Sequence, residues 1–194
     1  MVNYDKSMIC HIKNFASPKE IKILNDYLDS IELKNFKDVF YFDAEGNEYN
    51  GQREINDENI KIKMKKLDLK IKSFLSDHYF IDRGFSVVNY NWTRPLELIR
   101  WQVGSLLAKH SDGPSDPAEF PFIKIGTLIY LNDDYEGGEL VFNDYDIIIK
   151  PEPGDMVIFP NHYMHEVLKV LPKGSNTRRH TMPTFYVIEI KEKK

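Results

Sequence analysis

The sequence predicts an α+β fold that is mainly β: a double-stranded β-helix (jelly roll) with N-terminal helices packed against one sheet. Two amphipathic helical segments come first, and eight short β-rich segments follow from Phe85 onward, without an internal repeat. Neither the helical region nor the strand region contains a second layer that could cover its apolar face, so each needs the other to form a core. We therefore expect one domain over residues 1–194, with a helical support region at 1–84 and a jelly-roll core at 85–190.

The first predicted elements are a short strand over residues 8–15 and a helix that extends to about Ser30. Ser17 is a suitable N-cap, Pro18 suits the first helical position, and Glu20 completes a capping box. Apolar residues then recur at helical spacing. The pattern therefore predicts one amphipathic helix.

A second amphipathic helix is predicted over about residues 57–79, with its apolar residues on one face and its lysines mostly on the other. The segment between the helices, residues 36–56, is rich in Asp, Glu, Asn and Gly and has scattered aromatic residues. We interpret it as a loop or loose hairpin and as a candidate lid. It could close over a peptide together with Tyr90, Trp92 and Arg94, or these side chains could serve only in packing.

Eight strands are predicted in the second half of the chain because β-rich segments alternate there with turn signals such as adjacent glycines and Pro-Gly pairs. The predicted strands cover residues 85–92, 96–103, 123–131, 139–142, 146–149, 155–159, 166–170 and 184–190.

Composition and charge disfavour several classes of protein. The chain carries 26 Lys and Arg against 30 Asp and Glu, and its formal net charge of −4 disfavours a nucleic-acid partner. Its one cysteine, Cys10, can form neither an intramolecular disulfide nor a cysteine-based zinc cluster. Without an apolar signal region or a membrane-length apolar run, we expect a cytoplasmic protein with no membrane partner. The excess of lysine over arginine would fit a microbial or viral origin.

Three side chains have the composition of a metal site. His110 and Asp112 are two positions apart, so they share one face if a strand extends that far, and His165 begins a later predicted strand. Two imidazoles and one carboxylate form the facial triad that leaves coordination positions open for non-haem Fe(II) oxygen chemistry. A surface turn is the simpler alternative for the first pair. His162 competes with His165 for the third ligand position.

Five sequence blocks around these residues resemble the 2-oxoglutarate- and Fe(II)-dependent oxygenases, most closely their prolyl 4-hydroxylase branch. The resemblance spans about residues 98–187. The blocks are an aromatic-x-x-Gly motif, a strand with an acidic turn and a double glycine, a turn and strand, a distal histidine segment, and a basic residue on a late strand. They lie at residues 101–104, 130–142, 150–159, 165–167 and 179–181.

This resemblance implies an Fe(II)- and 2-oxoglutarate-dependent dioxygenase whose catalytic residues and metal ligands are His110, Asp112 and His165. Fe(II), 2-oxoglutarate and O2 are the implied cofactors, and ascorbate is a further candidate. The implied reaction hydroxylates a C–H bond, foremost of a prolyl residue in a peptide or protein, and releases succinate and CO2.

The resemblance also implies a cosubstrate pocket. Arg179 takes the place of the basic residue that holds the far carboxylate of 2-oxoglutarate, which a guanidinium can grip with two hydrogen bonds. Tyr130 takes the place of a tyrosine that bonds the same carboxylate, with core packing as its alternative. Trp101 is the third cofactor-binding candidate. Arg178 is expected on the opposite face of its strand, with a role left open.

At three positions the chain departs from the resemblance. Leu107 stands where many relatives have a tyrosine, which removes one polar contact. Lys124 lies close to the position of an arginine that holds the peptide, and Phe185 stands where relatives often carry a tryptophan against the substrate. Lys124 and Phe185 are therefore our candidate substrate residues, and we expect a selectivity different from that of relatives.

Two other functions stay open at this point. The same chemistry could act on a free amino acid or another small molecule. A non-catalytic jelly-roll module could instead bind a ligand or metal without turnover. The sequence does not give the oligomeric state.

Overall fold

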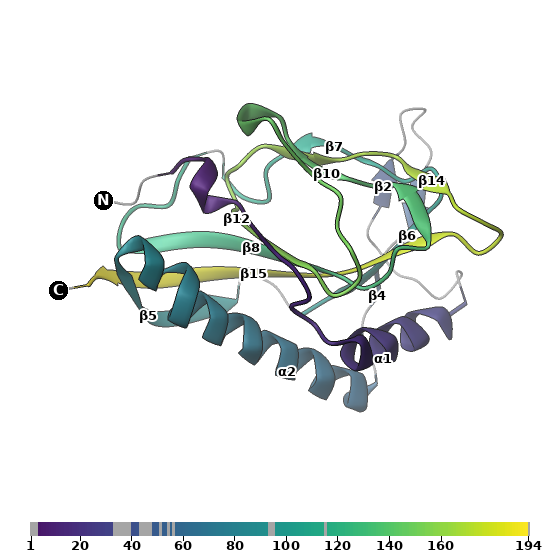
Figure 1. Ribbon diagram of the computed structural model, residues 1–194, viewed down its shortest axis with the longest axis horizontal. Helices are drawn as coiled ribbons and strands as arrows, with labels where there is room; N and C mark the ends of the chain where they lie inside the picture. Colours follow the sequence, from purple (N-terminus) through teal and green to yellow (C-terminus); the bar gives the residue numbers. More distant parts are fainter. Residues whose placement is uncertain are drawn as a thin grey trace.

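Two antiparallel β-sheets face each other and enclose the core of the protein (Figure 1). The computed structural model describes residues 4–193 apart from 33–39, 43–47, 51, 54, 56, 93–95 and 115. Within this part of the chain the larger sheet has seven strands and the smaller sheet has four. The arrangement is the predicted jelly roll.

The larger sheet is built around one long strand, β15 (Arg178–Glu192). β15 pairs with β6 along its first residues and with β5 along its last residues, while β8 pairs with its middle part. The order is β1-β12-β8-β15-β6-β4, with β5 also beside β15. These strands are β1 (Cys10–Ile12), β4 (Gln52–Arg53), β5 (Phe85–Trp92), β6 (Leu98–Gln102), β8 (Phe122–Tyr130) and β12 (Met156–Pro160).

The smaller sheet consists of short strands in the order β11-β10-β13-β7. They are β7 (Leu107–His110), β10 (Leu140–Phe142), β11 (Ile147–Ile149) and β13 (His165–Val167). Two separate ribbons complete the described strands. They pair β9 (Tyr135–Gly137) with β14 (Val170–Pro172), and β2 (Phe40–Phe42) with β3 (Glu48–Asn50).

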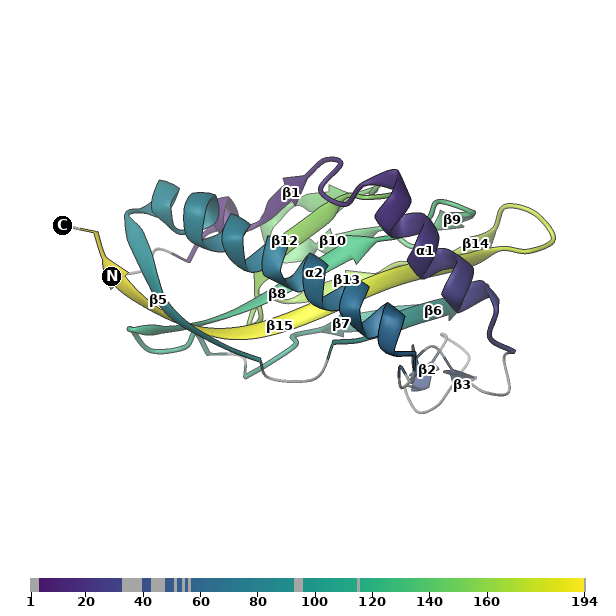
Figure 2. The ribbon, with the colours of Figure 1, turned by 90° about the horizontal axis from the view of Figure 1, so that it is seen from below.

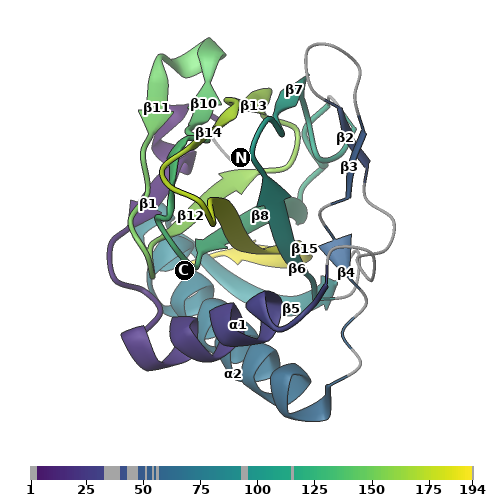
Figure 3. The same cartoon turned by 90° about the vertical axis from the view of Figure 1, so that its right-hand side faces the viewer.

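Two helices cover the outer face of the larger sheet, α1 (Pro18–Asp29) and α2 (Glu58–Phe74) (Figure 2). The predicted capping box is present, because Glu20 N donates to Ser17 Oγ at 3.3 Å and Ser17 N donates to the Glu20 carboxylate at 2.7 Å. α2 continues as a π-helical turn over Leu75–Tyr79. The end view in Figure 3 shows the order of layers: helices, larger sheet, smaller sheet.

Both polar and apolar side chains connect the helices to the larger sheet. Asn25 of α1 donates to the carbonyl of Leu131 at 2.6 Å, and the Tyr186 hydroxyl of β15 donates to Asp68 of α2 at 2.7 Å. The buried apolar residues of the helices and of both sheets belong to one continuous cluster. None of the described helices is long and apolar enough to span a membrane.

The structure corrects several predicted strand boundaries. The predicted strand 166–170 is two strands, β13 and β14, and β9 was not predicted. β7 was not predicted either, and Gly104, at φ 92°, turns the chain between β6 and β7. Only residues 10–12 of the predicted strand 8–15 pair in a sheet.

The candidate lid is only partly described. Within residues 36–56, β2 and β3 form an antiparallel pair, which agrees with the hairpin interpretation, and the rest of that segment falls mostly outside the described residues. Tyr90 packs against Tyr186 and donates to the carbonyl of Lys72, so its ring lies on the helix side of the larger sheet. The packing alternative is therefore correct for Tyr90. The Trp92 side chain and Arg94 lie outside the described part.

Candidate active site

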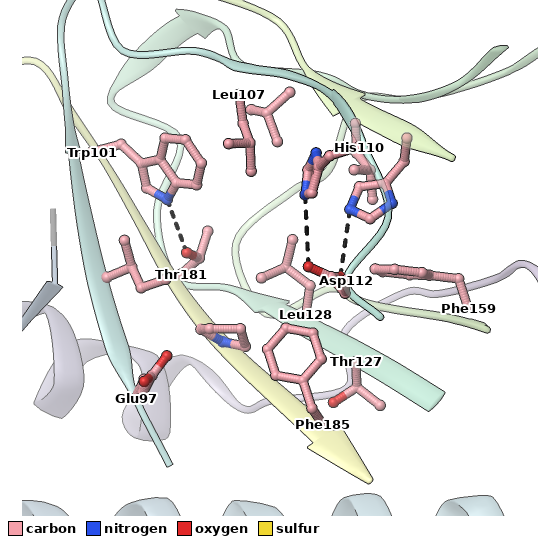
Figure 4. Close-up of a pocket in the computed structure, with 15 residues that line it drawn as sticks. Glu97, Trp101, Leu107, His110, Asp112, Thr127, Leu128, Phe159, Thr181 and Phe185 are labelled. Carbon is pink, nitrogen blue, oxygen red and sulfur yellow. Dashed lines mark hydrogen bonds and ion pairs between the residues drawn. The ribbon is translucent and has the colours of Figure 1, made fainter. Parts of the chain in front are cut away.

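His110, Asp112 and His165 meet at one end of a cavity between the two sheets (Figure 4). β7 ends at His110, β13 begins at His165, and the antiparallel pairing sets these two residues directly opposite each other. Asp112 lies two residues further on, in the loop after β7. Its carboxylate oxygens are 3.6 Å from His110 Nε2 and 3.5 Å from His165 Nε2. The ligand atoms of all three side chains lie within 4.8 Å of one another.

Backbone carbonyls orient both imidazoles. His110 Nδ1 lies 2.8 Å from the carbonyl oxygen of Ala108, and His165 Nδ1 lies 2.9 Å from that of Tyr163. Since a carbonyl oxygen only accepts, each neutral ring carries its proton on Nδ1 and presents a bare Nε2 toward Asp112. This is the arrangement in which histidine binds a metal through Nε2 with its other nitrogen held by a hydrogen bond.

The two histidines differ in their surroundings. Burial lowers the pKa of His165, whose ring lies against Phe142 and Phe159 at centroid distances of 5.6 and 4.8 Å. Burial also acts to lower the pKa of His110, but the protonated ring can donate to Asp112 as well as to the Ala108 carbonyl, and this outweighs burial, so the pKa is raised overall. His165 therefore favours the neutral form that coordinates metal, and His110 is held by the carboxylate of Asp112.

The donor set fits a divalent iron. Two imidazole nitrogens and one carboxylate oxygen approach from one side, and the side that faces the cavity stays available for other ligands. His110, Asp112 and His165 are therefore the residues that could hold a metal here.

The cavity behind this cluster has a volume of about 210 Å³. Its walls come from β6, β8, β12 and β15 of the larger sheet and from β7, β10 and β13 of the smaller one, and they are mostly apolar. The lining residues are Glu97, Ile99, Trp101, Leu107, His110, Asp112, Thr127, Leu128, Leu140, Phe159, His165, Val167, Thr181, Pro183 and Phe185.

Arg179 is fully buried next to the Trp101 and Thr181 wall of this cavity. Its guanidinium carbon lies 4.7, 5.2 and 6.0 Å from the ring centroids of Trp101, Tyr130 and Tyr135. None of its three nitrogens has a hydrogen-bond partner among the described residues, and neither does the buried hydroxyl of Tyr130. A buried cation without an anion is costly, so this pocket has the chemistry of a carboxylate-binding site.

Strand alternation explains why Arg179 and not Arg178 occupies this pocket. Thr181, Pro183 and Phe185 line the cavity, and Arg179 precedes them at the same two-residue spacing on β15. Arg178 lies on the other face, where its Nε is 2.5 Å from Asp29 of α1. The expected division between the two arginines is present in the structure.

The double glycine makes room for this pocket. Gly138 has φ +65°, and a Cβ there would lie 3.0 Å from both Arg179 Cδ and the Tyr135 ring. Gly137 has φ +64°, and a Cβ there would lie 2.1 Å from the carbonyl oxygen of Lys169. Each glycine therefore meets a separate steric requirement, one from the guanidinium and one from the neighbouring backbone.

The other candidate residues divide into those that line the cavity and those that lie outside it. Phe185 and Leu107 line it, whereas Lys124 is half-buried further along β8 and does not. His162 lies outside the cluster, with its ring 4.7 Å from that of Tyr4 and 4.8 Å from that of Tyr163. The structure therefore brings together His165, not His162, with the other two ligands.

Sequence reasoning missed three residues of this region. Thr181 accepts a hydrogen bond from Trp101 Nε1 at 3.1 Å, Tyr135 packs on Arg179, and Glu97 lines the cavity. Two of them follow a simple rule, since Thr181 is two residues from Arg179 and Glu97 is four from Trp101. Counting alternate residues on the predicted strand 96–103 would have found Glu97, whereas Thr181 lies on the part of β15 that precedes the predicted strand 184–190.

The fold and the cluster define a class: a jelly roll with two histidines and one carboxylate at the end of an apolar cavity. Residues 96–187 match the family model described as the 2OG-Fe(II) oxygenase superfamily. This part of the chain is a domain of that superfamily, whose members use Fe(II), 2-oxoglutarate and O2, and the chain is an Fe(II)- and 2-oxoglutarate-dependent dioxygenase. A search of curated protein sequences gives no significant match.

Solved structures of prolyl hydroxylases have the same fold. The viral collagen prolyl hydroxylase of Paramecium bursaria Chlorella virus-1, in a 2OG complex, aligns with a TM-score of 0.64 and 18% identity over 93% of this chain and 96% of that one. The Pseudomonas putida prolyl-4-hydroxylase aligns with a TM-score of 0.60 and 13% identity over 96% of this chain and 93% of that one. A Trichoplax adhaerens prolyl hydroxylase, in complex with a hypoxia inducible factor peptide fragment, aligns with a TM-score of 0.57 and 17% identity over 95% of this chain and 84% of that one. At these identities the likeness concerns the fold, which is that of the prolyl 4-hydroxylase-like branch.

Proposed function

We propose that this dioxygenase hydroxylates a C–H bond of a prolyl residue in a peptide or protein. The observation that carries the proposal is the presence of two features around one cavity. His110, Asp112 and His165 form a three-residue cluster at its end, and the buried guanidinium of Arg179, which has no hydrogen-bond partner among the described residues, lies behind its Trp101 and Thr181 wall. A 2-oxo dicarboxylate needs both features, one for each end. The prolyl substrate is supported by the fold shared with the prolyl hydroxylases above.

In this proposal each side chain has a defined task. His110, Asp112 and His165 hold Fe(II), and the carbonyls of Ala108 and Tyr163 keep both imidazoles in the coordinating tautomer. Bound Fe(II), 2-oxoglutarate and O2 together supply the oxidising chemistry of hydroxylation, with release of succinate and CO2. Protein groups contribute binding, orientation and the exclusion of water.

Arg179 and Tyr130 would bind the far carboxylate of 2-oxoglutarate. The guanidinium offers two parallel donors and the hydroxyl a third, and all of them are buried. Burial raises the pKa of Tyr130, although Arg179 acts against it, so this hydroxyl keeps its proton and can donate it. Trp101 forms a wall of the pocket and is itself held by Thr181.

The substrate would enter beside Phe185, with Lys124 further out on the same face of the larger sheet. Phe185 opposes Gly126 across the β15 and β8 pair, and Lys124 opposes Val187 two residues along. A Cβ at Gly126 would lie 3.2 Å from the Phe159 ring, so any larger residue at this position between Leu128 and Lys124 would crowd that ring.

The test is turnover of 2-oxoglutarate to succinate by the purified chain with Fe(II) and ascorbate, together with a +16 Da product on proline-containing peptides. Asp112→Ala should abolish both signals. Asp82→Ala is the matched control, because Asp82 is exposed near the end of the helical region, away from the cavity, and should leave turnover unchanged.

Three results would contradict parts of the proposal. No turnover with any proline substrate would rule out the prolyl assignment. Turnover with free amino acids and none with peptides would replace it by small-molecule hydroxylation. Full activity in Asp112→Ala would rule out the ligand assignment.

A further inference from the structure

Two strands of the larger sheet extend beyond the cavity and continue its wall outward. On β15 the cavity lining ends at Phe185, and Val187 and Glu189 follow on the same face at a spacing of two residues. On β8 the same face leads outward through Lys124 to Phe122. These two residues lie opposite Val187 and Glu189 in the pairing of β8 with β15. In Figure 1 this part of the larger sheet lies at the end of the molecule that carries both termini, beyond the labelled strands of the smaller sheet.

The two sides of this sheet region differ in what covers them. One side packs against α2, where the Tyr186 hydroxyl donates to Asp68 at 2.7 Å and Ile188 is fully buried. On the cavity side the side chains are half-buried or exposed, and Phe122 is 45% exposed. We call this cavity side the open face, and its six residues are Asn89, Asn91, Phe122, Lys124, Val187 and Glu189.

Two charges of the open face lack a partner within the described part of the protein. Neither Lys124 nor Glu189 forms an ion pair with a described residue. Their order is defined by β15, because Lys124 lies opposite Val187 and Glu189 is two residues further out. A chain that runs outward from the cavity therefore meets a cation first and then an anion beside the exposed Phe122. Such a surface favours an acidic side chain near the cavity and an apolar or basic one further out.

The reach of the open face distinguishes between kinds of occupant. A strand rises by about 3.3 Å per residue, so the positions of Lys124 and Phe122 lie roughly 7 and 13 Å beyond Phe185 along the sheet. A free amino acid held at the metal cluster does not extend that far, whereas an extended peptide has nearly the same rise per residue. This step rests on the proposed function: with the target prolyl residue beside Phe185, its second and fourth neighbours in the peptide meet Lys124 and Phe122.

We infer that the open face binds the polypeptide that flanks the hydroxylated residue, so that the substrate is a peptide or protein segment and not a free amino acid. The face selects an acidic side chain about two residues from the target and an apolar or basic side chain about four residues from it. Binding energy from these flanking residues holds the target at the metal cluster, and a free amino acid cannot obtain it.

The test compares peptides that differ only in their flanking side chains. Acetylated, amidated peptides with a central proline in an alanine and serine background are titrated by calorimetry into the chain loaded with Mn(II) and N-oxalylglycine, a non-reactive analogue of 2-oxoglutarate. Aspartate is placed two residues and phenylalanine four residues from the proline, on its N-terminal side in one series and on its C-terminal side in the other. In one series the doubly substituted peptide should bind about tenfold more tightly than the unsubstituted peptide. Acetylproline amide should bind no more tightly than the unsubstituted peptide.

Variants of the open face assign each preference to one side chain. Phe122→Ala should remove the preference for phenylalanine and keep that for aspartate. Lys124→Glu should reverse the preference for aspartate, so that a peptide with lysine in its place binds more tightly. The matched controls are Ile148→Ala and Lys150→Glu, at exposed residues on and next to β11, outside the open face, and both should keep the two preferences. The wild-type comparison needs no variant, so it holds even if a substitution fails to fold.

Three results would overturn the inference. Equal affinity for acetylproline amide and for the doubly substituted peptides of both series would show that no flanking residue is bound. Wild-type preferences in either Phe122→Ala or Lys124→Glu would place the flanking residues elsewhere. A lower mass of Phe122→Ala in sedimentation, at unchanged peptide affinity, would make the open face a contact between copies of the chain.

A failure of the proposed function gives a different result. Peptides that bind with the expected preferences but never gain 16 Da with Fe(II) and 2-oxoglutarate would contradict the prolyl proposal alone. Hydroxylation of acetylproline amide and of every longer peptide with the same KM would contradict only the role of the open face.

Discussion

Arg179 combines two properties that seldom occur together: its side chain is fully buried, and its guanidinium lacks a polar partner among the described residues. Aromatic rings on three sides give it cation–π contact but no hydrogen bond. A residue in this state lowers the stability of the ligand-free protein and raises its affinity for an anion. We therefore expect Arg179 to lower the stability of the ligand-free protein and to raise its affinity for 2-oxoglutarate.

Substitution by methionine should reveal both effects. Arg179→Met replaces a buried charge by an apolar chain of similar length, so the free energy of unfolding without ligand should not fall, because a desolvated charge is gone. The affinity for 2-oxoglutarate should fall by about 2 kcal/mol, roughly 30-fold, because a desolvated bidentate pair is lost. Urea unfolding and calorimetric titration measure the two quantities.

The adjacent arginine provides the control. Arg178 is paired with Asp29 on the helix side of β15, so Arg178→Met should leave 2-oxoglutarate affinity unchanged. Wild-type affinity in Arg179→Met would contradict the assignment of the pocket.

His180 predicts how stability depends on pH. Its Nδ1 faces the side-chain oxygen Oδ1 of Asn25 at 2.8 Å and therefore carries the proton. Burial, with Arg100 and Arg178 nearby, lowers the pKa of His180 to about 3, against about 6.5 in an unfolded chain. Below pH 6.5 the unfolded chain therefore binds a proton that the folded chain does not.

Stability should accordingly fall as the pH falls from 6.5. The contribution of His180 is roughly 1.4 kcal/mol per pH unit, or about 2 kcal/mol between pH 6.5 and 5. Urea unfolding across this range should show a smaller decrease in His180→Gln, which cannot take up the proton. Parallel curves for the variant and the wild type would contradict a depressed pKa of His180.

At the scale of elements, the turn that joins β9 to β10 packs directly against the side chain of Arg179. Gly138→Ala would place a methyl group 3.0 Å from Arg179 Cδ in a backbone with φ +65°. We expect a loss of about 1–2 kcal/mol of stability from the left-handed backbone alone. We also expect weaker 2-oxoglutarate binding, because the guanidinium must shift.

Gly84 separates these two effects. It has φ +81°, and a Cβ there would meet nothing within 4 Å, so Gly84→Ala should cost similar stability and leave 2-oxoglutarate affinity unchanged. Thermal unfolding and calorimetric titration of both variants make the comparison. If Gly138→Ala binds the cosubstrate normally, the glycine serves only the turn.

The contact between α2 and β15 depends on a buried hydrogen bond. Tyr186 donates to Asp68, whose carboxylate is also 3.0 Å from Lys72, and Tyr186 and Asp68 are buried. Tyr186→Phe should lower the free energy of unfolding by about 1–3 kcal/mol, since it removes a donor from a buried carboxylate. Tyr27→Phe, which removes a half-exposed hydroxyl of α1, should change it much less. Equal losses in the two variants would contradict the role of this bond.

The helices could be predicted from the sequence more accurately than the short strands. Both helix starts and the end of α1 were predicted almost to the residue, because Ser17 and Glu20 act locally and a helical period extends over many turns. The predicted end of the second helix at residue 79 includes the π-helical turn that follows α2. The three-residue strands β9, β13 and β14 were missed or merged, since a strand this short shows no period of its own and is defined by its partner.

The candidate site shows the same limit. The residue types and order of His110, Asp112 and His165 pointed to a metal, but their distances depend on the pairing of β7 with β13, which is a tertiary fact. Glu97 could have been found by alternation from Trp101.

At the scale of the whole molecule, folding itself brings the three candidate metal ligands together. His110 and His165 come from two strands that are far apart in sequence, and Asp112 comes from the loop after β7, so the unfolded chain has no preformed site. A ligand that binds only the folded state adds to the free energy of unfolding. Metal affinity and thermal stability should therefore be linked.

The last prediction measures this link. At a Mn(II) concentration roughly 100 times its Kd, the free energy of unfolding should rise by about 2.7 kcal/mol, which corresponds to an increase in Tm of about 5–10 °C for a chain of this size. A chelator should reverse the shift, Asp112→Ala should lack it, and Asp82→Ala should keep it. If Asp112→Ala is stabilised as much as the wild type, the metal binds elsewhere, because removing the carboxylate that both imidazoles face must weaken a site built from the three.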